Sequence, residues 1–87
     1  MNFVAIIGIV DDCKKINDYT TELLIKTEKP NYTNEEDWYE KLSVLVSNEQ
    51  FKQELESINN GTIIGIKGRL SLVNKQNKII SEKVHLF

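Results

Sequence analysis

The sequence has 87 residues, of which 40% are hydrophobic and 28% are charged, and its formal net charge is −2. This length suits one domain with a thin core, and the charge balance excludes a strongly basic nucleic-acid binder. With one cysteine, Cys13, and one histidine, His85, the chain cannot form an internal disulfide or assemble a Cys/His metal cluster. We therefore expect no metal and no cofactor.

The charges are distributed unevenly along the chain. Residues 1–60 carry six lysines and twelve acidic residues, whereas residues 61–87 carry five cations and one acidic residue, Glu82. The local balances are −6 and +4, so we expect a polyanion to meet the C-terminal part first. The start, Met1–Val10, lacks a basic leader and is shorter than a membrane span. We expect a cytoplasmic protein with no membrane partner.

Three strands are predicted in the first half of the chain. Phe3–Val10 is apolar at both its odd-numbered and its even-numbered positions, which indicates a strand covered on both sides. Asp11–Asp18 is polar and predicts a turn, whereas the threonines, leucines and isoleucine of Tyr19–Lys26 favour a second strand. The third strand, Trp38–Val46, alternates between a mainly apolar side and a side that carries Tyr39.

A helix is predicted after the third strand, because the hydrophobic period changes there. Three apolar residues recur at the spacing of one helical face: Phe51, Leu55 and Ile58. Ser47 is a favourable N-cap, and Gln50 three residues later completes a capping box. Gly61 lies where a residue of positive φ would end the helix. We expect a helix over Asn48–Asn59.

Two further strands are predicted after the helix. The turn pair Asn60-Gly61 precedes a strand whose apolar face carries Ile64, Ile66, Gly68 and Leu70. Its other face carries Lys67 and Arg69. Asn74–Lys78 predicts a polar hairpin tip, and Ile79–Phe87 predicts the final strand. On that strand we expect Ile80, Val84 and Leu86 to face the core and Lys83, His85 and Phe87 to face outward.

Three strands, a helix and two strands form the element order of the OB-fold. This fold is an all-β, five-stranded Greek-key barrel, here with one α-helix between strands three and four. We expect a single OB-fold domain over residues 1–87, in which Gly8, Gly65 and Gly68 occupy barrel corners. An open α+β sheet with one helix is the alternative.

Similarity to one known family runs through four segments: Met1–Gly8, Trp38–Val46, Phe51–Leu70 and Asn77–Val84. The family is that of the bacterial single-stranded-DNA-binding proteins, which the chain resembles over nearly its whole length in its order of turns and strands. The resemblance implies a dimer or tetramer built partly on the first strand, Phe3–Val10. The two-sided apolar character of that strand independently favours an oligomer, because exposed it would be prone to aggregation.

Two features depart from the family's pattern. The family places a stacking aromatic just after its fourth strand, where this chain has Val73–Lys75. It also adds an acidic tail beyond the last strand, whereas this sequence ends at Phe87. The chain therefore resembles a short, tail-less member with fewer stacking positions.

A single-strand binder needs a cationic groove for phosphates and aromatic faces on which bases stack. The candidate residues for such a site are Trp38, Lys67, Arg69, Lys75, Lys78, Tyr32, Tyr39 and Lys26. In the alternative interpretation Trp38 and Tyr39 pack on the barrel and the lysines are ordinary surface residues. The acidic residues next to Trp38 are unfavourable for a phosphate path: Glu35, Glu36, Asp37 and Glu40.

Two functions follow as hypotheses. The first is binding of single-stranded DNA, or RNA, without sequence specificity, in replication, repair or recombination. The second is a reduced OB-fold that serves as a protein-interaction or assembly module with weak or no nucleic-acid binding, similar to primosomal accessory proteins or to a paralogue in a mixed oligomer. The sequence presents no nucleophile–base pair, and the adjacent carboxylates cannot converge on one substrate, so we expect no enzyme.

Overall fold

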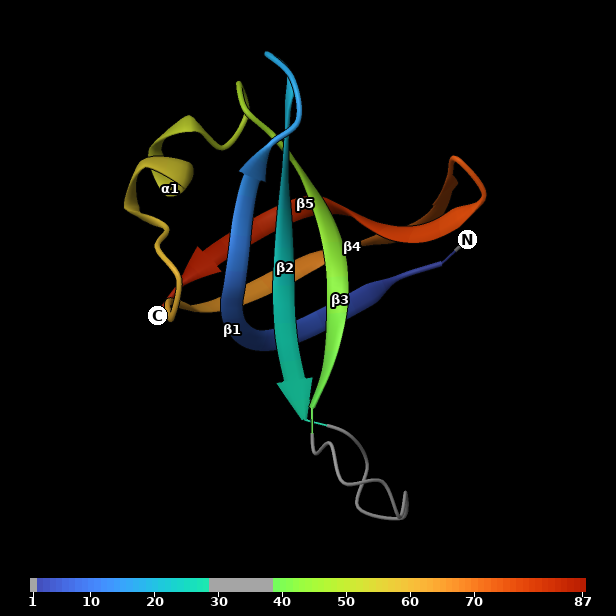
Figure 1. Cartoon of the computed structure of the whole chain (residues 1–87), viewed down its shortest axis with the longest axis horizontal. Helices are drawn as coiled ribbons and strands as arrows, with labels where there is room; N and C mark the ends of the chain where they lie inside the picture. Colours follow the sequence, from blue (N-terminus) through green and yellow to red (C-terminus); the bar gives the residue numbers. More distant parts are fainter. Residues whose placement is uncertain (1, 29–38) are drawn as a thin grey trace.

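The structure is a computed structural model and describes residues 2–28 and 39–87. Its elements are β1 (Val4–Lys15), β2 (Thr20–Glu28), β3 (Tyr39–Ser47), α1 (Lys52–Ser57), β4 (Ile63–Val73) and β5 (Gln76–Leu86). The strands close into a barrel in the order β1-β2-β3-β5-β4, with α1 following β3 at one end (Figure 1). The predicted OB-fold is therefore confirmed, with five strands and one short helix between β3 and β4.

The barrel closes because β1 bends and pairs with two different strands, β4 and β2. Val4–Ile9 pairs with β4, and Ile9–Lys15 pairs with β2. At the bend, a Cβ added to Gly8 would lie 2.6 Å from the carbonyl oxygen of Lys26. The strands approach each other so closely here that only glycine fits, which explains this strand glycine.

The parallel pairing of β3 with β5 completes the closure and is short. It consists of two register partners, Val44 with Ile79 and Leu45 with Ile80. The Ser81 hydroxyl extends the contact by donating a hydrogen bond of 2.7 Å to the carbonyl of Leu45. Beyond this point the two strands diverge.

The first strand is longer than predicted. It continues to Lys15, so the polar turn expected over Asp11–Asp18 is wrong for its first five residues. The register shifts between Val10 and Asp12, which makes Asp11 a bulge. After the bulge the polar residues can pair with β2 at the barrel surface, as Lys14 does with Glu22.

The helix is shorter than predicted, Lys52–Ser57 instead of Asn48–Asn59. Ser47 does accept a hydrogen bond of 3.2 Å from the backbone N–H of Gln50, but it caps a turn that precedes the helix. Gly61 has a positive φ of 94°, at the third position of the turn that begins at Asn59. Gly61 therefore belongs to the turn that leads into β4, and it does not end the helix.

The last strand contains a register shift that corrects the prediction for Ile80. Gly68 pairs with Ser81, whereas Lys67 pairs with Lys83, so Glu82 is an extra residue. An extra residue inverts the inward and outward sides along a strand. Consequently Ile79, and not Ile80, is buried, while Val84 and Leu86 pack on the core as predicted. Leu70, predicted to face inward, is 44% exposed where the β4–β5 hairpin leaves the barrel.

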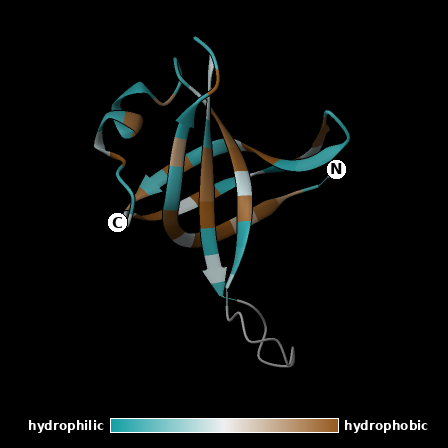
Figure 2. Ribbon diagram, viewed as in Figure 1, coloured by the Kyte–Doolittle hydropathy of each residue, from teal (hydrophilic) through white to brown (hydrophobic). Residues whose placement is uncertain are grey.

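The core lies inside the barrel and under α1. Its buried members are Val10, Leu23, Ile25, Val44, Val46, Phe51, Ile58, Ile64, Ile66 and Ile79. Hydrophobic residues concentrate in the middle of the strands (Figure 2). In the two described ranges, no helix has the length and apolar character to cross a membrane.

Candidate nucleic-acid interface

The outside of the barrel presents two contrasting surfaces. The first, called the β2–β3 face, is mainly polar and consists of Glu22, Leu24, Lys26, Tyr39, Lys41, Ser43, Leu45, Lys78 and Ile80. The second, called the apolar face, consists of Phe3, Ala5, Ile7, Ile9, Ile63, Gly65, Lys67, Lys83, His85 and Phe87. The predicted site residues divide between them.

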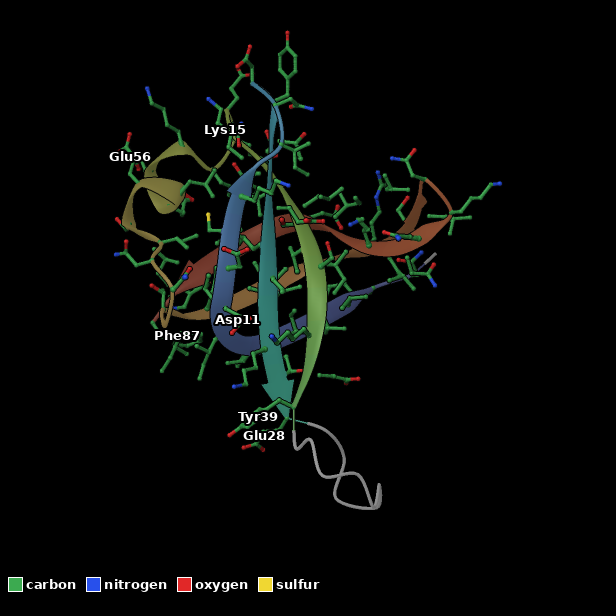
Figure 3. All side chains as sticks on the ribbon, viewed as in Figure 1. Asp11, Lys15, Glu28, Tyr39, Glu56 and Phe87 are labelled. Atoms are coloured by element: carbon green, nitrogen blue, oxygen red, sulfur yellow. The ribbon has the colours of Figure 1, made fainter. Side chains whose placement is uncertain are left out.

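Lys26 and Tyr39 come together at one end of the β2–β3 face. The Lys26 ammonium lies 4.4 Å from the centre of the Tyr39 ring, in a cation–π contact. Tyr39 remains 46% exposed, beside Glu28, with which it is paired across the two strands (Figure 3). An exposed aromatic ring next to a cation is the combination that single-strand binding requires.

Lys78 reaches the middle of the same face from β5. Its ammonium lies 2.5 Å from Glu22 Oε2 and 3.1 Å from Ser43 Oγ, and the Ser43 hydroxyl donates a hydrogen bond of 2.6 Å to Glu22. The hydrogen bond from Lys78, followed by that from Ser43, holds the pKa of the Glu22 carboxylate below its ordinary value of about 4.5. The stability that this pair contributes is therefore present at neutral pH and is lost as the pH falls through the lowered pKa.

The remaining lysine of this face is also paired. Lys41 lies 3.0 Å from the Asp11 carboxylate, which the bulge in β1 directs outward. Lys75 is exposed at the tip of the β4–β5 hairpin, where Asn74 and Lys75 both have positive φ. Lys26 and Lys75 thus do not take part in these two ion pairs. The positive charges of Lys41 and Lys78 are partly neutralised by them.

The two cations of β4 fall on different surfaces. Arg69 pairs with Ile80, whose other neighbour is Leu45, so Arg69 borders the β2–β3 face. Lys67 pairs with Ala5 on one side and with Lys83 on the other, within the apolar face. Trp38 and Tyr32, the two other predicted aromatics, lie outside the described residues.

The apolar face is large for an exposed surface. Four of its hydrophobic side chains are at least half exposed: Phe3, Ile7, Ile63 and Phe87. A shallow depression of about 740 Å³ lies over it, bordered by Ile7, Phe87 and the two lysines, Lys67 and Lys83. Contiguous exposed apolar surface of this kind marks interaction sites.

Several residues of these surfaces were not identified from the sequence. Ser43 and Glu22 hold Lys78 through contacts that join three strands. No pattern in the sequence predicts these contacts. Tyr19 is 78% exposed at the β1–β2 turn. Its position directly after the turn residues Asn17 and Asp18 was a usable signal, because connecting segments run over the protein surface.

Comparisons with known proteins agree on the fold. No protein-family model matches the sequence, and no curated protein matches it significantly. Among solved structures, the dimeric N-terminal domain of PriB from Thermoanaerobacter tencongensis is similar, with 17% identity, a TM-score of 0.74 and coverage of 99% of this chain and 96% of that one. PriB from Ralstonia solanacearum has 10% identity, a TM-score of 0.77 and coverage of 100% and 99%. The mitochondrial single-stranded DNA binding protein Rim1 of S. cerevisiae has 13% identity, a TM-score of 0.73 and coverage of 97% and 91%.

Proposed function

We propose that this protein binds single-stranded DNA without sequence specificity, as part of replication, repair or recombination. The observation that carries the proposal is the Lys26–Tyr39 pair, an exposed ring under a cation on the outer face of β2 and β3. In OB-folds this face and the β1–β2 and β4–β5 loops are where oligonucleotides bind. Rim1, which shares the fold, is a single-stranded DNA binding protein.

The proposed path of the strand crosses the β2–β3 face. Tyr39 stacks on a base while Lys26 contacts an adjacent phosphate. Lys75 and Lys78 contact the sugar-phosphate backbone of the DNA from the side of the β4–β5 hairpin. Arg69 borders this path. Lys67 stands on the apolar face, and its predicted role in binding stays a prediction, as do those of Trp38 and Tyr32.

The protein is proposed to act as a homodimer, or as a tetramer formed by two such dimers, that buries the apolar face. Phe3, Ile7 and Phe87 are each 67–68% exposed in the single chain, and a second copy is the simplest cover for them. The PriB domain from Thermoanaerobacter tencongensis is dimeric. This arrangement leaves the β2–β3 face open to a strand.

Titration of a fluorescently labelled oligo-dT tests the proposed function. At low salt we expect an increase in anisotropy that saturates, and unlabelled duplex of the same length should compete poorly, because stacking requires unpaired bases. Raising the salt concentration should weaken the complex, because each neutralised phosphate releases counterions. Failure of the protein to bind oligo-dT at low salt would contradict the proposal.

Glu22 is a carboxylate on the proposed path, and Glu22→Gln should strengthen binding. The substitution removes a negative charge and releases Lys78 from its ion pair. One additional phosphate contact steepens the slope of log affinity against log salt by about 0.7 for a single strand. We expect several-fold tighter binding at low salt. Glu56→Gln on α1, away from this face, is the control for the change in net charge, and equal effects of the two substitutions would contradict the path.

A second function is favoured by a specific observation, the pairing of Lys41 with Asp11 and of Lys78 with Glu22. These pairs reduce the positive charge available for phosphates, while the apolar face remains available for proteins. The alternative is an assembly module with weak or no nucleic-acid binding. It predicts a stable oligomer together with no response in the oligo-dT titration.

A further inference from the structure

A groove lies at the end of the β2–β3 face that is nearest to the β1–β2 turn. It opens where β3 and β5 diverge beyond their two register partners. Its volume is about 390 Å³, and the residues around it include Tyr19, Thr20, Leu45, Ser47, Gln50 and Ile80. This volume falls within the range of small-ligand sites, about 300–1,000 Å³.

Tyr19 is exposed although its backbone is firmly held. Its N–H donates a hydrogen bond of 2.8 Å to Asn17 Oδ1, and its carbonyl accepts one of 2.9 Å from the N–H of Asn48. Asn48 in turn donates through Nδ2 to the carbonyl of Asn17 and accepts from the hydroxyl of Thr21. The ring, 78% exposed, is therefore carried on a fixed support, and a partner stacking on it need not order the backbone.

The described residues around the groove are uncharged. Leu45 and Ile80 supply an apolar floor, and Thr20, Ser47 and Gln50 supply hydrogen-bonding groups at its rim. A flat ring with polar edges, such as a nucleobase, matches this combination of an exposed aromatic residue at the edge, an apolar floor and a polar rim.

Cations stand on both sides of the groove. One row of paired residues crosses all five strands: Lys14, Glu22, Leu45, Ile80 and Arg69. Neighbours in such a row lie roughly 4.5–5.5 Å apart at their Cβ atoms. Lys14 and Arg69 thus flank the floor formed by Leu45 and Ile80. The one carboxylate of the row, that of Glu22, is already paired with Lys78.

We propose that this groove is a subsite for one nucleobase of the bound strand. The base stacks on Tyr19 above Leu45 and Ile80, and the phosphates on either side of it reach Lys14 and Arg69. The inference rests on the proposed function and adds a second stacking position, at the opposite end of the β2–β3 face from Tyr39. A strand that occupies both positions runs along the whole length of β2 and β3.

The test compares Tyr19→Leu with Tyr19→Phe in the oligo-dT titration at several salt concentrations. Leucine keeps the apolar character but loses the stacking face, so we expect about 10-fold weaker binding at every salt concentration. The salt slope should remain that of the unsubstituted protein, because no phosphate contact is lost. Phenylalanine should bind as tightly as tyrosine. Because Tyr19 is exposed, neither substitution should change the denaturation midpoint.

Photo-crosslinking provides a direct measurement. Irradiation of the complex with oligo-dT that contains 5-iodouracil should yield a crosslinked peptide that includes Tyr19. If the unsubstituted protein binds and Tyr19→Leu binds equally tightly, with crosslinks elsewhere only, the groove proposal is overturned while the proposed function stands. If the unsubstituted protein does not bind oligo-dT, the proposed function fails, and the groove proposal fails with it.

Discussion

Gly68→Ala is expected to destabilise the barrel by about 3 kcal/mol, at the upper end of the range for overpacking. An added Cβ would lie 2.0 Å from the carbonyl oxygen of Ile80 and 3.1 Å from the Cα of Ser81. These are backbone atoms of the neighbouring strand, so β4 and β5 must separate beside the bulge. Urea denaturation should show a clearly lower midpoint with a similar slope.

Gly65→Ala is the matched control for this substitution. The added Cβ would meet the Phe87 ring at 3.2 Å, and in the single chain that side chain is exposed and can move, so both variants are compared as monomers. We expect the free energy of unfolding to change by less than about 0.5 kcal/mol. Equal midpoints for Gly68→Ala and the unsubstituted protein would show that β4 and β5 do not approach each other as described.

Ile7→Glu is expected to convert the protein into a monomer. Ile7 is 67% exposed near the centre of the apolar face, where the proposed interface would bury it. A carboxylate buried there without a partner is strongly unfavourable, and we expect the dissociation constant to increase by about 100-fold. Sedimentation at micromolar concentration should give the mass of one 10.1 kDa chain.

Ile16→Glu controls for the change in charge and hydrophobicity. Ile16 is 49% exposed at the β1–β2 turn, outside the apolar face, so this variant should keep the mass of the oligomer. If the Ile7→Glu variant remains an oligomer, the interface between the subunits does not lie on the apolar face. A monomeric unsubstituted protein at the same concentration would remove the proposed oligomer altogether.

The element order was predictable because local patterns determine it. Alternation of apolar residues and turn pairs such as Asn60-Gly61 predicted five strands and one helix, and the structure confirms that order. Two of the errors lie at bulges. An extra residue at Asp11 prolongs β1, and one at Glu82 moves Ile79 instead of Ile80 into the core. A bulge depends on how one strand pairs with its neighbour, so the alternation of residues along a single strand cannot reveal it.

The candidate site was predictable only in its residue types. The sequence identified Lys26, Tyr39 and Lys78 as a basic and aromatic set, and the structure places all three on the β2–β3 face. It could not show that Glu22 neutralises Lys78, because their contact joins residues 56 positions apart. Nor could it separate Lys67 from Arg69, since only the bulge on β5 and the closed barrel assign them different neighbours.

The central claim is that the β2–β3 face carries the single strand, and a comparison of Lys26→Gln with Lys67→Gln tests it most directly. Both substitutions remove one positive charge from an outward position, one on each face. In oligo-dT titrations over a range of salt concentrations, Lys26→Gln should weaken binding at low salt and reduce the salt slope by about 0.7. Lys67→Gln should leave both unchanged, and that result would overturn the prediction from the sequence that Lys67 contacts the DNA. The reverse result, a reduced slope for Lys67→Gln alone, would contradict the account and place the strand on the apolar face.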